Sequence, residues 1–292
     1  MNVPNKTESG LRLALPKGRM ADGVFALLGD AGIRVRTGER GYRPTVSVPG
    51  FEVKILKPQN IIEMLHAGSR DIGFAGADWV AELDAELVEL LDTGMDPVAL
   101  VAAAPRALLE GGKLPERPLV VASEYPRLTE RWMKKQTSPM KFVRSYGATE
   151  VFPPEDADCI IDITQTGSTL RANGLGIVDE LLSSSTRLYA NGAALGDSNK
   201  RKLIDDFVLL LRSVLEARDR VMLEVNVPLG QFEQLIAVLP CMRKPTVARL
   251  HGEEGYAVKA AVPKNALPAL IPALKQCGGT DVVVTRLSQI VP

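Results

Sequence analysis

The sequence predicts an α/β fold with a larger section on a mainly parallel sheet and a small α/β domain after it. Two patterns carry this prediction. Short apolar runs alternate with amphipathic helical stretches through the first part of the chain, and the last part has the order strand, helix, strand, strand, helix, strand. The chain has 292 residues, of which 46% are apolar. This length favours two or three domains.

The first stretch repeats a strand followed by a helix. Pro58 suits the first turn of a helix, and Gly68 suits a helix end. The predicted strands lie at 11–15, 51–56 and 71–75, and the predicted helices at 20–31, 61–67 and 77–83. Such alternation implies parallel strands with helices on the faces of the sheet.

A second stretch begins where Gly94 to Pro97 predict a break in the chain. Its predicted strands lie at 98–103, 119–122, 141–144, 159–162 and 187–189, and its predicted helices at 126–135, 169–182 and 197–217. In the last of these helices apolar residues recur near a helical period, and Asp197 or Ser198 can cap its start.

The last stretch has predicted strands at 221–227, 246–250, 256–262 and 281–286, with helices at 231–238 and 265–276. Pro268 and Pro272 weaken the second helix. The order β-α-β-β-α-β is that of the ferredoxin-like split motif.

Composition excludes several functions. The 35 Lys and Arg residues balance 35 Asp and Glu residues, which argues against a nucleic-acid partner but allows a local phosphate pocket. The longest apolar run, 98–104, is too short for a membrane helix, and the first ten residues lack a signal core. Three scattered cysteines offer no zinc site and predict reduced thiols. We therefore expect a soluble cytoplasmic protein without a membrane partner.

The most informative motif runs from Cys159 to Leu170, where an apolar strand ends in Asp162 and a hydroxyl-rich turn precedes a helix. Free N–H groups at a helix start suit a phosphate, and Asp162 is placed to accept hydrogen bonds from sugar hydroxyls. The other residues of the loop are Thr164, Thr166, Gly167, Ser168 and Thr169. The pattern suits a ribose 5-phosphate. The alternative is a helix capped by Thr166 or Ser168.

A second motif places Lys17 and Arg19 on either side of Gly18, directly after the first strand. Two cations at the carboxyl end of a strand suit a polyphosphate. The alternative is a solvated turn.

With these motifs in their order, the sequence resembles the ATP phosphoribosyltransferase family in its long form. The similar segments are 15–19, 71–76, 122–126, 147–150 and 162–175, together with 221–291, which is similar to the long form's regulatory domain. The segment 162–175 looks very like the family's phosphoribosyl-pyrophosphate loop.

The resemblance implies a two-lobed catalytic part of the periplasmic-binding-protein-like type II fold, followed by a ferredoxin-like regulatory domain. Lobe I would comprise 1–96 with 186–217, lobe II would comprise 97–185 and carry the loop, and the regulatory domain would be 218–292. The family is a cytoplasmic pentosyltransferase of histidine biosynthesis. N1 of ATP displaces pyrophosphate from phosphoribosyl pyrophosphate with Mg²⁺, and no protein nucleophile is required. The partners implied are histidine, as allosteric inhibitor, and further copies, as dimers that assemble to a hexamer.

Carried over by position, the resemblance assigns the 5-phosphate to Thr164, Thr166, Gly167, Ser168 and Thr169, and the ribose hydroxyls to Asp162. It assigns ATP or polyphosphate to Lys17, Arg19, Asp71, Gly76 and Glu150. Glu150 is equally well explained as an acid at a helix start. Two other functions stay open: a solute-binding protein of the same fold, and a regulatory paralogue without activity.

Overall fold

The computed structural model describes residues 10–37, 41–252 and 254–291. Residues 1–9 and 38–40 of the predicted lobe I lie outside the described residues. So do residues 253 and 292 of the predicted regulatory domain. The chain divides into two compact units, Met1–Ala26 with Ile33–Asp205 and Leu27–Gly32 with Asp206–Pro292. The predicted boundaries between lobes and domain stay predictions.

The larger unit is built on one eight-stranded sheet with the order β4-β1-β5-β10-β6-β9-β7-β8. Two long antiparallel strands, β6 (Val88–Pro105) and β10 (Leu175–Ala190), form its centre. On one side lie the parallel strands β1 (Leu11–Pro16), β4 (Phe51–Leu56) and β5 (Ile72–Gly76). On the other side lie the parallel strands β7 (Leu119–Ser123), β8 (Met140–Arg144) and β9 (Cys159–Thr164).

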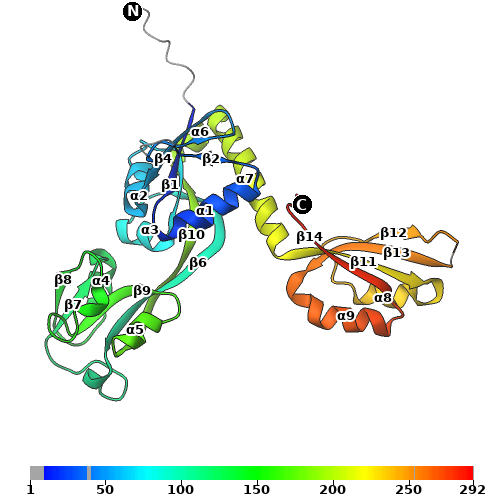
Figure 1. Ribbon diagram of the computed structural model, residues 1–292. Helices are drawn as coiled ribbons and strands as arrows, with labels where there is room; N and C mark the ends of the chain where they lie inside the picture. Colours follow the sequence, from blue (N-terminus) through cyan, green and yellow to red (C-terminus); the bar gives the residue numbers. More distant parts are fainter. Residues whose placement is uncertain (1–9, 38–40, 253, 292) are drawn as a thin grey trace, which may run out of the picture. The chain divides into compact units, whose positions relative to one another are not determined.

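The strand register separates these two groups into lobes. β5 pairs with β10 only over Thr186–Ala190, whereas β9 pairs with β6 only over Ala99–Ala103. The two groups therefore attach to different stretches of the central ribbon, as Figure 1 shows. The helices α1 (Arg19–Asp30), α2 (Pro58–His66) and α3 (Ala77–Leu83) accompany the first group, and α4 (Pro126–Met133) and α5 (Ser168–Ala172) the second.

Each lobe has its own apolar core. In the first, Ile61, Ile62 and Leu65 of α2 pack against Ala14 of β1 and Ala75 of the fully buried strand β5. In the second, Trp132 of α4 packs with Val121 and Ile161. Separate cores on one sheet are what a two-lobed α/β protein requires.

The remaining elements of the larger unit are short or connect it to the second unit. They are the two-stranded sheet β2 (Val35–Arg36) with β3 (Thr45–Val46), the 3₁₀ turns η1 (Arg106–Leu108) and η2 (Thr149–Val151), and the helices α6 (Gly192–Gly196) and α7 (Ser198–Arg218), of which α7 runs into the second unit.

Two expectations for the central ribbon are wrong. The predicted break at Gly94 to Pro97 lies inside the continuous strand β6, because Gly94 and Asp96 adopt positive φ and the pairing with β10 shifts register there. β-bulges absorb such residues without ending a strand. The predicted helix at 169–182 ends at Ala172, because Gly174 turns the chain with φ +70° and β10 then begins. The predicted strand at 187–189 is the end of β10.

The second unit contains a four-stranded antiparallel sheet with the order β12-β13-β11-β14. Its elements are β11 (Arg220–Pro228), η3 (Leu229–Gln231), α8 (Phe232–Val238), β12 (Thr246–Arg249), β13 (Gly255–Pro263), η4 (Lys264–Ala266), α9 (Leu267–Gln276) and β14 (Thr280–Arg286). Buried residues alternate along β11, and α8 and α9 bury Leu235 and Leu270 with them. This is the ferredoxin-like arrangement. The predicted fold class is confirmed for both parts.

Within the described ranges, no helix is both long enough and apolar enough to cross a membrane.

Candidate functional site

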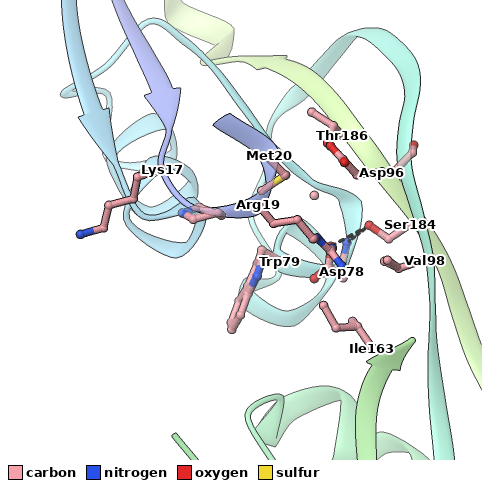
Figure 2. Close-up of a pocket in the computed structure, with 13 residues that line it drawn as sticks. Lys17, Arg19, Met20, Asp78, Trp79, Asp96, Val98, Ile163, Ser184 and Thr186 are labelled. Carbon is pink, nitrogen blue, oxygen red and sulfur yellow. Dashed lines mark hydrogen bonds between the residues drawn. The ribbon is translucent and has the colours of Figure 1, made fainter. Parts of the chain in front are cut away.

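A cavity of about 170 Å³ opens in the larger unit beside the carboxyl ends of β1 and β5 (Figure 2). Lys17 and Arg19 follow β1, and Gly76 ends β5. The other lining residues are Met20, Pro58, Asp78, Trp79, Asp96, Val98, Ile163, Ser184, Ser185 and Thr186. Ligands of open α/β sheets bind beside the carboxyl ends of strands, so this cavity is the candidate site.

The two predicted cations stand at the start of α1. Neither Lys17 nor Arg19 has an ionic partner among the described residues, and the Lys17 ammonium lies 5.7 Å from the ring centroid of the exposed Tyr42. Figure 2 shows the Arg19 side chain extending into the cavity, while the Lys17 amino group points away from the other lining side chains. A helix start already favours anions, so two further cations there suit a ligand with several negative charges.

Asp78 connects three elements at the floor of the cavity. Its Oδ1 accepts a 2.6 Å hydrogen bond from the Ser184 hydroxyl, which in turn accepts from the Asp78 N–H at 3.1 Å. Its Oδ2 accepts from the Tyr125 hydroxyl at 2.8 Å. Asp78 belongs to the first lobe, Ser184 to the ribbon and Tyr125 to the second lobe. This buried network therefore joins both lobes at the site.

Tyr125 is also held by its ring, which stacks on Trp79 with centroids 4.6 Å apart. Tyr125 is only 2% exposed, and the pKa of its hydroxyl is raised far above the ordinary value by burial and by the Asp78 carboxylate. Tyr125 therefore stays protonated and serves as a hydrogen-bond donor. Sequence reasoning assigned no role to Tyr125, which lies in the similar segment 122–126, and it missed Asp78.

Gly76 has a local reason to be glycine. A Cβ at this position would lie 2.1 Å from Asp78 Oδ1. The missing side chain leaves the space in which the Asp78 carboxylate turns back over the start of α3.

Asp71 does not line this cavity, and its predicted contact with ATP or polyphosphate stays a prediction. Asp71 precedes β5 and so lies at the opposite end of that strand from Gly76. It is 2% exposed, and Oδ1 accepts hydrogen bonds from Arg12 at 2.7 Å and Lys200 at 3.0 Å. Burial raises its pKa, but the bonds from Arg12 and Lys200 outweigh burial and keep that pKa below the ordinary value. Asp71 therefore forms a buried structural ion pair with Arg12 and Lys200.

The predicted phosphoribosyl loop, from Thr164 to Thr169, forms a tight turn after β9. The Thr164 hydroxyl accepts from the Gly167 N–H at 2.9 Å, and the Thr166 hydroxyl donates to Ser168 Oγ at 3.0 Å. The N-cap of α5 is Gly167, with φ +70° and no side-chain cap bond, although the Thr166 hydroxyl accepts from the N–H of Ser168, the first residue of α5, at 3.4 Å. The side chains of Thr166, Ser168 and Thr169 are exposed. Their hydroxyls are available to a ligand.

Asp162, at the base of this loop, sits among acids. Its Oδ1 accepts from the Ile163 N–H at 2.7 Å. Burial is the main cause that raises its pKa to about 6, and repulsion from Glu150 and Glu124 adds to it. The structure thus brings Glu150, in η2, to the predicted ribose acid. Glu124 was missed as a site residue, because only the fold brings it near Asp162.

The loop and the cation pair are linked through β9. Among the described residues, the only lining residue that β9 gives to the cavity is Ile163, and Asp162 and Thr164 lie on the opposite face of the strand by alternation. The structure therefore brings Lys17, Arg19 and Gly76 together in one pocket and places the loop beside it.

Comparisons with known proteins add to this geometry. A family model described as ATP phosphoribosyltransferase matches residues 57–213, and one described as HisG, C-terminal domain, matches 217–289. The chain belongs to the ATP phosphoribosyltransferase family. The curated ATP phosphoribosyltransferase of Koribacter versatilis is 36% identical, over 96% of this chain and 99% of that one. That of Pelotomaculum thermopropionicum is 34% identical, over 97% and 99%. The predicted family is confirmed.

The solved structure of the ATP phosphoribosyl transferase (HisG:HisZ) complex from Thermotoga maritima is also similar, with a TM-score of 0.63 and 27% identity. The match covers 70% of this chain and 98% of that chain. For an ATP phosphoribosyltransferase, a cation pair and a hydroxyl-rich loop at strand ends are the expected kinds of group. The two functions without catalysis that the sequence left open are not favoured, because these relatives are named for the transferase.

Proposed function

We propose that this chain catalyses the first step of histidine biosynthesis, in which N1 of ATP attacks C1 of phosphoribosyl pyrophosphate and pyrophosphate leaves. The observation that carries the proposal is the position of Ile163. It lies between Asp162 and Thr164 in β9 and lines the same cavity as Lys17 and Arg19. The end of β9 thus reaches the cavity through Ile163, while Asp162 and Thr164 lie on the other face of the strand. This closeness supports one site in which the loop holds the phosphoribosyl group and the cations hold polyphosphate.

In this proposal each motif holds one part of a substrate. The loop from Thr164 to Thr169 binds the 5-phosphate through hydroxyls and backbone N–H groups, and Asp162 accepts hydrogen bonds from the ribose hydroxyls. Lys17 and Arg19 meet the polyphosphate of ATP. With a pKa of about 6, Asp162 is mostly ionised at neutral pH, which an acceptor of two hydroxyls requires.

The chemical step needs little from the protein beyond position and charge. The bond between C1 and the pyrophosphate oxygen breaks as the bond to N1 of adenine forms, and the ribose ring develops positive charge. Holding the two substrates in line removes much of the entropic barrier, and the acids near Asp162 suit positive charge on the ribose. The chain supplies this alignment and this negative charge from residues at rigid strand ends. No covalent intermediate is required.

We propose that Mg²⁺ accompanies the pyrophosphate as part of the substrate. Mg²⁺ is commonly held by one or two carboxylates together with substrate phosphates. Among the residues with described positions, no group of three Asp, Glu, His or Cys side chains is arranged to hold a metal ion. One or two of the carboxylates near the loop, among Asp162, Glu150 and Glu124, would be enough for a metal held mainly by phosphate oxygens. When bound, the ion offsets charge on the leaving pyrophosphate.

The activity test uses purified full-length chain with ATP, phosphoribosyl pyrophosphate and Mg²⁺, with pyrophosphatase present to remove product. N1-alkylation of adenine changes its ultraviolet absorbance. Thr166→Val should raise KM for phosphoribosyl pyrophosphate far more than KM for ATP, and Lys17→Ala should do the reverse. Glu155→Gln, an exposed acid in the second lobe, is the matched control. Absence of product would refute the function, and equal effects on both KM values would refute the assignment of the motifs.

We further propose that the C-terminal domain makes the enzyme sensitive to histidine and assembles dimers into a hexamer. Support comes from its sheet, whose edge strands β12 and β14 are largely exposed and can pair with further copies. Removing 218–292 should abolish inhibition by histidine and change the mass measured by sedimentation. Inhibition that persists in an active truncated protein would refute this role. The proposed location is the cytoplasm, because Cys159, Cys241 and Cys277 are free thiols.

A further inference from the structure

A second cavity, of about 570 Å³, lies in the smaller unit where α7 ends and β11 begins. Four of its ten lining residues are cations. They are Arg218, Arg220, Lys264 and Arg286, and the other lining residues are Asp30, Val214, Ala217, Val221, Leu287 and Ser288. A neighbouring hollow of about 730 Å³ is lined by Arg218, Arg220 and Lys264 as well. None of these residues belongs to the site described above.

The register of the sheet explains why four cations meet there. Arg220 starts β11 and pairs with Pro263, which ends β13 directly before Lys264. Val221 pairs with Arg286, the last residue of β14. Arg220, Lys264 and Arg286 therefore lie together at the same end of three neighbouring strands. Arg218, the last residue of α7, lies next to Arg220 in the chain.

Two of the four cations are not neutralised. Arg218 pairs with Asp30 at 2.8 Å, and Arg220 pairs with Glu216 at 3.2 Å. Lys264 and Arg286 have no ionic partner within the described part of the chain. Asp219, which lines the neighbouring hollow, holds the start of η4, because its carbonyl accepts from the Lys264 N–H at 2.9 Å. The cavity therefore carries an excess of positive charge from Lys264 and Arg286, and the bond from the Lys264 N–H fixes the backbone there.

The floor of the cavity is apolar. Val214, Ala217 and Val221 line it and are at most 4% exposed. The C-terminal segment runs back along α7, where the Ile290 N–H donates to the Ser213 carbonyl at 2.8 Å, and it adds Leu287 and the Ser288 hydroxyl. A site of about 300–1,000 Å³ with an apolar wall and a few convergent polar groups is typical for a small organic ligand.

We propose that this cavity binds a small phosphorylated metabolite, with its phosphate between Lys264 and Arg286 and its organic part on the floor formed by Val214, Ala217 and Val221. An arginine fork beside a lysine matches the oxygens of a phosphate. The apolar floor favours an organic phosphate over inorganic phosphate. The ligand bridges the end of α7 and the sheet, so it also fixes the junction at Asp219.

Phenyl phosphate is a suitable probe, because it carries a phosphate and an apolar ring and resembles neither proposed substrate. Full-length protein with ¹³C-labelled valine methyl groups is titrated with it. The expected result is a saturable shift of the Val214 and Val221 methyl signals. Lys264→Ala and Arg286→Ala should each weaken binding by about tenfold, since each removes one charged hydrogen-bond partner. Asp30→Asn should strengthen binding, because it removes a competing negative charge.

Lys275→Ala is the matched control, since Lys275 is exposed on α9 and away from this cavity. Unchanged methyl spectra of the unliganded variants show that they fold, and Arg286→Lys keeps the charge and should restore part of the affinity. Three results would overturn the proposal: no shift at either valine, shifts of equal size with phenol, or binding that survives the Lys264 and Arg286 replacements together. Inorganic phosphate binding as tightly as phenyl phosphate would also overturn it.

Discussion

Replacement of Asp162 by Asn should stabilise the free enzyme while it damages the site. Burial and the neighbouring acids raise the pKa of Asp162 from 3.8 to about 6. Each pKa unit corresponds to about 1.4 kcal/mol, so the ionised carboxylate costs the folded state about 3 kcal/mol. Asn has nearly the same shape, can still accept from the Ile163 N–H, and carries no charge. The variant should therefore unfold at a higher urea concentration at neutral pH.

The pH dependence follows from the direction of the shift. Below about pH 4 the carboxyl is protonated in both the folded and the unfolded chain, so the variant gains nothing there. As pH rises from about 4 to about 6, only the unfolded chain loses the proton readily, and the wild type loses stability. The advantage of Asp162→Asn should grow across this window and stay constant above it.

Urea unfolding followed by tryptophan fluorescence measures this difference. Both tryptophans, Trp79 and Trp132, lie in the same unit as Asp162, so the signal reports the unit that contains the site. Glu155→Gln removes an exposed acid from the same lobe and should show no such window. A difference between Asp162→Asn and wild type that is independent of pH would falsify the reasoning, and so would a variant that is less stable above pH 7.

Three further replacements test the network around the cavity. Tyr125→Phe leaves the buried Asp78 carboxylate one donor short and should cost about 1–3 kcal/mol in urea unfolding, whereas an unchanged midpoint would show that the bond is not needed. Gly76→Ala places a Cβ 2.1 Å from Asp78 Oδ1 and should cost about 1–3 kcal/mol; a variant as stable as wild type would contradict this packing. Asp71→Asn breaks a buried pair with two cations and should cost about 3 kcal/mol without changing either KM, and a selective rise in KM for ATP would restore Asp71 to the site.

Local sequence patterns predicted the elements whose signals are local. The alternating burial along β11 and the order of the C-terminal elements follow from apolar periodicity and turn residues, which a single segment carries. The extents of β6 and β10 were harder to predict from sequence. Gly94 and Gly174 are breakers in any local pattern, yet Gly94 sits in a bulge within a strand and Gly174 ends a helix after one turn. Only pairing between distant residues decides these cases.

The site shows the same division. The cations at 17 and 19 and the loop after β9 were predicted because each motif is continuous in sequence. Asp71 lies at the other end of β5 from the cavity, and a motif that spans a whole strand does not tell which end faces the ligand. Asp78 and Glu124 were missed, because their partners Tyr125 and Asp162 are brought to them by the fold.

The two sides of the site carry opposite charge, and this has a measurable consequence. Asp162 lies near Glu150 and Glu124, whereas Lys17 and Arg19 have no acidic partner among the residues described. A substrate that needs Asp162 as an acceptor must bind its ionised form, so binding near pH 6 should release a proton from the fraction that is protonated. With a pKa of about 6, wild type should release about half a proton more at pH 6 than Asp162→Asn when phosphoribosyl pyrophosphate binds, and the two should agree at pH 8. Calorimetry in buffers of different ionisation enthalpy measures this release, and the variant corrects for protons that leave the substrate itself. An equal release from both proteins at pH 6 would mean that the substrate binds without ionising Asp162, and the ribose assignment would then be wrong.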